Sequence, residues 1–155
     1  MLRTRPIVLK TVDTILKFHD FVFSDAAARI PHILALVIEE AYDETQPDPE
    51  RSERAIEALI AILRHAPCLI SLRLSSATGG QPCGYLHDKR VSAAVSKVVS
   101  LRELAIKGQM EVTDFISAMR SPLTKLTLCF LLNPTGGSLD WSSITISAKI
   151  GRAHV

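Results

Sequence analysis

The sequence predicts an α/β fold in which one parallel β-sheet is backed by a single row of helices. A segment of the form L-x-x-L-x-L, with isoleucine at some of the leucine positions, occurs four times in the 155 residues. Before three of these segments, apolar residues recur at i, i+3, i+4 and i+7, the spacing of one helix face. Neither kind of segment can bury its apolar side alone. Stacked helix–strand units form one sheet, with a helix crossing over between successive parallel strands.

We expect the repeated segments to be strands near residues 33–39, 69–75, 101–107 and 123–129, with a fifth strand in the β-prone run near 5–9. A proline stands just before three of the four segments, which disfavours a helix running directly into the strand. The spacing from one segment to the next varies, so the repeat is irregular. The repeated apolar positions are Ile33, Leu36 and Ile38; Leu69, Leu72 and Leu74; Leu101, Leu104 and Ile106; and Leu123, Leu126 and Leu128.

Helices are expected before these strands. Asp48 and Pro49 predict the start of one helix, because the carboxylate accepts from free amides and proline suits the first turn. Ser24 and Asp25 are expected to cap a short AAAR turn in the same way, and Pro31 to end it. The expected apolar stripes are Val12, Ile15, Leu16 and Val22; Ile56, Leu59, Ile60 and Leu63; Val91, Ala94, Val95 and Val98; and Val112, Phe115, Ile116 and Met119.

The composition is that of a soluble globular domain. The chain is 47% hydrophobic and 22% charged, unlike a disordered sequence. A net charge of +2 without a dense basic stripe gives no case for binding nucleic acid or an anionic membrane. No apolar run approaches the roughly 18–20 residues of a membrane span, and the basic N-terminal segment lacks the apolar core of a secretion signal. We therefore expect an intracellular protein, cytoplasmic or nuclear.

The cysteines favour a reducing compartment over a disulfide framework. Cys68, Cys83 and Cys129 are odd in number and widely spaced, with no CxxC motif. Cys83 and His87 have a spacing that fits half of a metal site, but no second pair of ligands stands nearby. We expect free thiols and no metal.

No catalytic or cofactor motif is present in the sequence. The glycines of the loop 78–88 suggest a phosphate-binding turn, but the loop lacks the G-K-[ST] of a Walker A motif, so ordinary turn glycines explain it better. The histidines are scattered, no serine lies in G-x-S-x-G, and the acidic residues gather only in the solvated segment 43–53. We expect no cofactor and no enzymatic activity.

The most informative candidate surface is the side of the sheet that the helices leave uncovered. Alternate strand residues point there, and we call this surface the open face. Arg73, Lys107 and Lys125 make it mildly basic against Glu103, although Glu103 and Lys125 occupy the same position on adjacent strands and could neutralise each other. The sequence allows two interpretations of the open face, a docking site for a partner protein or an ordinary solvated surface. The members of the open face are Ala35, Val37 and Glu39; Ser71, Arg73 and Ser75; Glu103, Ala105 and Lys107; and Lys125, Thr127 and Cys129. The partner-binding candidates among them are Ser71, Arg73, Glu103, Lys107, Lys125 and Thr127.

These segments resemble leucine-rich repeats, and more narrowly the irregular repeats of fungal F-box proteins. The resemblance covers about residues 5–148, and residues 5–40 look like the segment that leads into the repeats in such proteins. It implies a solenoid whose concave sheet, here the open face, binds a protein. The chain would then be the substrate-recognition part of a ubiquitin-ligase receptor, reaching the ligase adaptor only through an F-box. A scaffold or inhibitor-like binder unrelated to ubiquitin is the alternative.

The sequence departs from that family in two respects. The F-box is not visible in this chain. The position usually occupied by asparagine or cysteine after each strand holds Ala41, Ala77, Gln109 and Leu131, so the asparagine ladder of the family is absent.

The two ends of the sequence look like cuts. The last six residues, 150–155, match one reading frame of a common sequencing adapter, so we expect read-through there and a partial repeat domain over 1–149. The residues after Met1 likewise look like mid-domain sequence. After a glycine turn, residues 139–146 begin either a further helix or a further strand.

Overall fold

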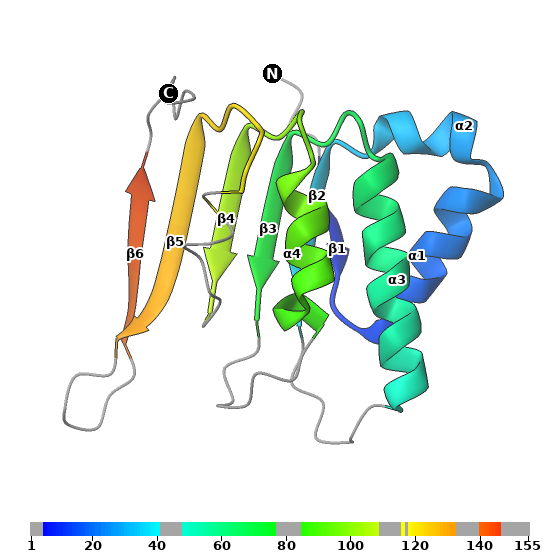
Figure 1. Cartoon of the computed structure of the whole chain (residues 1–155), viewed down its shortest axis with the longest axis horizontal. Helices are drawn as coiled ribbons and strands as arrows, with labels where there is room; N and C mark the ends of the chain where they lie inside the picture. The colour runs from blue at the N-terminus through cyan, green and yellow to red at the C-terminus, as the bar shows by residue number, and fades with distance from the viewer. Residues whose placement is uncertain are drawn as a thin grey trace.

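A computed structural model describes residues 5–40, 48–76, 85–108, 116, 118–132 and 140–146. The chain forms one six-stranded sheet with the helices on one of its faces (Figure 1). The strands are β1 (Ile7–Leu9), β2 (Ala35–Glu39), β3 (Ser71–Ser75), β4 (Glu103–Lys107), β5 (Lys125–Leu132) and β6 (Asp140–Ile146). The helices are α1 (Val12–Ser24), α2 (Ala26–Arg29), α3 (Pro49–His65) and α4 (Lys89–Ser96), with 3₁₀ turns η1 (Ile30–His32) and η2 (Tyr85–His87).

The strands lie in the sheet in the order in which they occur in the chain. β1 to β5 are parallel, and the sheet is open rather than closed into a barrel. Leu36, Leu72, Leu104 and Leu126 are direct neighbours in register, so equivalent positions of the repeated segments stand side by side. Each of the five parallel strands begins two residues after the start of its expected range, and β5 runs on past residue 129.

The last strand departs from a purely parallel sheet. Residues 140–146 form a strand and not a helix, and β6 pairs antiparallel with β5 from Leu126↔Ile146 to Leu132↔Asp140. A short connection returns the chain beside the strand that it has just left, which produces antiparallel pairing, whereas a parallel partner needs a crossover of a dozen or more residues. The helix-to-strand repeat therefore ends at β5.

The start of each inner strand is held by the same hydrogen-bond arrangement. A carbonyl oxygen just before one strand accepts from two successive N–H groups at the start of the next, with N–O distances of 2.7–3.1 Å. This repetition shows that the starts of β3, β4 and β5 share one hydrogen-bond geometry. The acceptors are Leu34, Ile70 and Arg102, and the donor pairs are Ile70 with Ser71, Arg102 with Glu103, and Thr124 with Lys125.

The core lies between the helices and the inward side of the sheet. The inward leucines and isoleucines of β2, β3 and β4 are at most 2% exposed. In α3 the buried surface is wider than the predicted stripe, because Ala55, Ala58 and Ile62 are buried in addition to Leu59. The reason is that α3 packs against α1 and α4 as well as the sheet (Figure 1).

Helix capping follows the sequence at α3 and differs at α2. Asp48 caps α3 as predicted, and its Oδ1 accepts from Glu50 N–H at 3.1 Å. The prediction for Ser24 and Asp25 is wrong, because Asp25 makes no side-chain cap and the Ser24 hydroxyl donates to the Phe21 carbonyl at 2.9 Å.

Pro31 does not terminate α2, which ends at Arg29. It lies inside η1, where the chain continues in a tighter turn before β2.

Several predictions fall outside the described residues. They concern most of the expected 112–119 helix, Cys83, the loop positions 77–84 and the segment 150–155. Within the described part, Ile116 and Met119 pack against the core. No helix there combines the length and the apolar character that a membrane span requires.

Candidate protein-binding face

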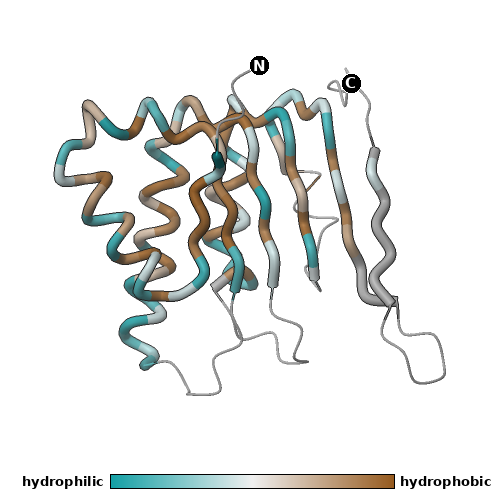
Figure 2. Tube along the Cα trace, turned by 180° about the vertical axis from the view of Figure 1, so that it is seen from behind, coloured by the Kyte–Doolittle hydropathy of each residue, from teal (hydrophilic) through white to brown (hydrophobic). Residues whose placement is uncertain are grey.

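The open face is formed as the alternation of the strands predicts. Its residues line up across β2 to β5 in three rows, and the helices lie on the opposite side of the sheet. Figure 2 views the molecule from the side of the sheet opposite the helices, and apolar and polar residues alternate along the strands. The rows are Ala35, Ser71, Glu103 and Lys125; Val37, Arg73, Ala105 and Thr127; and Glu39, Ser75, Lys107 and Cys129.

A shallow hollow of about 220 Å³ lies on the open face over β3, β4 and β5. All six predicted partner-binding residues line it, so the structure brings them together on one surface. They are Ser71, Arg73, Glu103, Lys107, Lys125 and Thr127. Side chains from three different strands therefore border one depression, which residue spacing along the chain could not show directly.

The charges of the open face are not evenly balanced. Glu103 and Lys125 are register partners, as expected, although no ion pair joins them among the described residues. Glu39, at the β2 end, is paired with Lys10, with a carboxylate–ammonium distance of 3.1 Å. Arg73 lies between Val37 and Ala105 in its row, and neither neighbour can pair with a guanidinium.

The expected free thiols are found where the chain is described. Cys68 and Cys129 are unpaired and partly buried, and Cys129 lies on the open face beside Lys107. Within the described ranges, no group of three histidine, cysteine or acidic side chains is placed to hold a metal ion. Cys83 lies outside those ranges, so the Cys83–His87 spacing stays a sequence observation.

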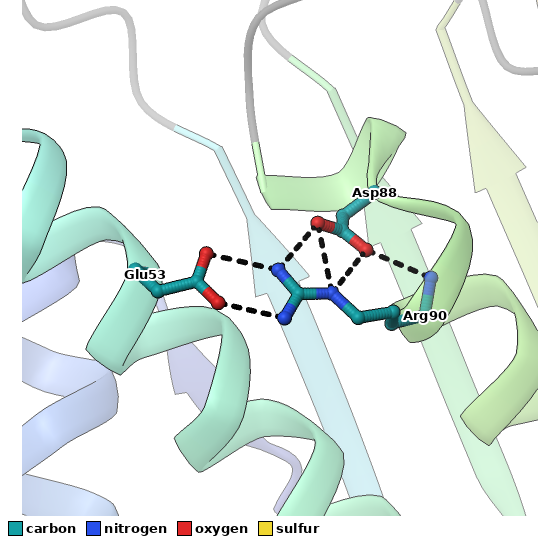
Figure 3. Close-up of polar contacts among 3 residues, drawn as sticks. All are labelled: Glu53, Asp88 and Arg90. Carbon is teal, nitrogen blue, oxygen red and sulfur yellow. Dashed lines mark hydrogen bonds and ion pairs between the residues drawn. The ribbon is translucent and has the colours of Figure 1, made fainter.

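A second polar cluster lies on the helix side and joins α3 to α4 (Figure 3). The Arg90 guanidinium donates from Nη1 and Nη2 to the two Glu53 oxygens at 2.6 and 2.9 Å. It also donates from Nε to Asp88 Oδ1 at 3.1 Å and from Nη2 to Oδ2 at 2.9 Å. Asp88 caps α4, accepting from Arg90 N–H at 2.8 Å.

These contacts alter the acidity of all three groups. The hydrogen bonds from Arg90 hold the pKa of Glu53 below its ordinary value, against a smaller opposing effect of desolvation. The side-chain hydrogen bonds from Arg90 to Asp88 likewise lower the pKa of the Asp88 carboxyl. Hydrogen bonds to Glu53 and Asp88 raise the pKa of Arg90.

Sequence reasoning did not find this cluster. An aspartate two residues before an arginine at a helix start was a usable signal for the Asp88 cap. The partner Glu53 comes from a different helix, 37 residues away, and only packing brings it near. Because both carboxylates are bonded to one guanidinium, the cluster joins α3 to α4.

A second, apolar hollow lies beside β1 and the end of α1. Phe21 is 57% exposed, and the Arg29 guanidinium carbon lies 4.0 Å from the centroid of its ring. Arg29 also donates to the Phe21 carbonyl oxygen and, at 2.6 Å, to the Ser24 hydroxyl. This arginine covers the aromatic ring from within the chain.

Comparison with protein-family models, with curated proteins and with solved structures finds no match to this chain.

Proposed function

We propose that this chain is a non-enzymatic protein-binding module and that a partner docks on the open face. One observation carries the proposal. The helices lie on one side of the sheet, and on the other side residues of three strands border the hollow. The residues at this hollow combine charged groups that orient a partner with short side chains that allow close approach.

We propose further that the architecture is an irregular leucine-rich-repeat solenoid. The sequential parallel order of β1 to β5, the in-register leucines and the repeated junction hydrogen bonds support it. β6 is then the departure from the repeat, since it lies antiparallel at the edge of the sheet.

The narrower part of the proposal is that the module recognises substrates for a ubiquitin ligase. The resemblance of residues 5–148 to the repeats of fungal F-box proteins is its only support, and an intracellular location goes with it. The complete open reading frame tests this part. An F-box helical motif encoded within about 100 residues upstream supports the ligase role, whereas its absence favours a scaffold or inhibitor-like binder.

Blocking the hollow tests the docking surface itself. In the full-length protein, Ala105→Tyr and Thr127→Tyr place bulk in the hollow without changing charge, and tyrosine suits a strand. We expect both variants to lose most of the partner recovered with the wild-type protein, measured by affinity purification from the source cells. Glu57→Tyr, on the exposed side of α3, is the matched control. Unchanged capture by correctly folded Ala105→Tyr and Thr127→Tyr would refute the docking surface.

A further inference from the structure

We propose that the open face binds an acidic segment of its partner in an extended conformation, with a partner carboxylate on the Arg73 guanidinium. This inference rests on the proposed function, because it names the chemistry of what docks.

Arg73 is an exposed cation at the middle of β3, with apolar neighbours in its row. Val37 on one side is 8% exposed, and Ala105 on the other is partly buried. Within the described residues Arg73 makes no ion pair. Its five N–H groups form a planar fork that matches a carboxylate, so an acidic side chain is the group that it recognises best.

Each acidic residue of the open face lies next to a cationic side chain other than Arg73. Glu39 is bound to Lys10, and Glu103 stands directly opposite Lys125 in register. In the lining of the hollow, Arg73 and Lys125 stand against the one carboxylate of Glu103. The surplus positive charge attracts an anionic segment and opposes a basic one.

The width and the lining of the hollow suit an extended segment. Adjacent strands are about 4.8 Å apart, so the distance from β3 to β5 is about 10 Å, the length of roughly three extended residues. The short side chains of Ser71, Ala105 and Thr127 leave room for a peptide backbone to pass close to the sheet.

The test compares two short peptides that differ only in charge. Glutamate alternates with threonine in one, and glutamine alternates with threonine in the other. Alternate residues of an extended chain face the same side, so the first peptide directs all its carboxylates together. We expect the glutamate peptide to bind the full chain about tenfold or more tightly by fluorescence anisotropy, to weaken as salt rises, and to shift the NMR amide signals of β3 to β5.

Charge reversal supplies the matched variants. Arg73→Glu with Lys125→Glu is expected to remove the preference for the glutamate peptide. Arg54→Glu with Arg64→Glu makes the same change of net charge on exposed positions of α3, away from the open face, and is expected to retain the preference. Circular dichroism and thermal unfolding confirm that both double variants are folded. Equal affinity for the two peptides, or an unchanged preference after Arg73→Glu with Lys125→Glu, overturns the proposal.

The same variants separate this inference from the proposed function. If the Ala105→Tyr block abolishes partner capture but Arg73→Glu with Lys125→Glu does not, the face binds a partner whose docking segment is not acidic. If the block leaves capture unchanged, the docking surface itself is wrong. Both proposals are supported if Ala105→Tyr and Arg73→Glu with Lys125→Glu each abolish partner capture and the wild-type chain prefers the glutamate peptide.

Discussion

Among the residues that the structure describes, Gly108 occupies a position that opposes a side chain. It follows β4 with a φ of +122°, and a Cβ built there lies 1.8 Å from the Oγ of Ser76, which is buried. The close approach has a cause in the sheet, because Ser76 N–H donates to the Lys107 carbonyl at 2.9 Å and Gly108 N–H to the Cys129 carbonyl at 3.1 Å. Successive strand ends are thereby drawn together.

Replacement of this glycine tests the close approach. We expect Gly108→Ala to lower the free energy of unfolding by about 1–3 kcal/mol in urea denaturation, since both the positive φ and the contact oppose a methyl group. Adding Ser76→Ala removes the hydroxyl and should recover part of the loss, while the backbone cost remains. A Gly108→Ala protein as stable as wild type would show that the strand ends lie further apart.

The Glu53–Arg90–Asp88 cluster predicts an acid-dependent contribution to stability. The pKa of each carboxyl is lowered on folding, so the stabilisation is complete above the unfolded pKa and is lost as the pH falls below about 4. We expect Arg90→Gln to have a lower Tm than wild type near neutral pH, with a difference that shrinks toward pH 3. The raised pKa of Arg90 adds no pH dependence in this range, because the guanidinium stays charged throughout.

The control for that measurement is Arg54→Gln, on the exposed side of α3. Its Tm difference from wild type should be small and nearly independent of pH. A difference for Arg90→Gln that is equally large at pH 7 and pH 3 would contradict an electrostatic origin.

At the scale of elements, α3 is the helix on which the packing depends most. It lies between α1 and α4 and covers the sheet, so its buried surface extends well beyond one narrow stripe. The alanines at positions 55 and 58 suit this place, because small side chains let neighbouring helices approach closely. An aspartate cap and Pro49 at the first turn set where this helix begins.

Shortening a buried side chain of α3 is therefore expected to lower the free energy of unfolding substantially. Leu59 is fully buried, and Leu59→Ala should lower the free energy of unfolding by about 2–5 kcal/mol, because the rigid surroundings cannot close the cavity. Chemical denaturation measures the loss. Glu57→Ala, two residues away on the exposed side, should change stability by no more than about 0.5 kcal/mol. Similar losses for the two variants would contradict this orientation of α3.

At the scale of the whole molecule, stability should fall from the middle of the sheet toward its edges. β3 has a hydrogen-bonded neighbour on each side, and its inward leucines, Leu72 and Leu74, are 1% exposed. β1 and β6 are the outermost strands of the described sheet, and each pairs on one side only.

Native-state hydrogen exchange measures this gradient directly. We expect the amides of β3 to exchange slowest and those of β1 and β6 fastest. The three-residue length of β1 adds to the difference. Uniform protection across the six strands would contradict the gradient and indicate that the whole sheet opens in one step.

The sequence alone was enough to predict the parallel strands, the direction of their side chains and the start of α3. Period-two apolar patterns and local caps depend on neighbouring residues only, so Leu72 and Leu74 could be assigned to the core and Arg73 to the open face without coordinates. The same reasoning failed at Asp25, which stands at the start of α2 but makes no side-chain cap.

Only the tertiary structure decided which distant groups meet. The direction of β6, the burial of Ala55 and Ala58, the bond between Glu53 and Arg90, and the approach of Ser76 to Gly108 all depend on how separate elements pack. The physical reason is that hydrophobic periodicity specifies which side of an element is buried but not which neighbour buries it.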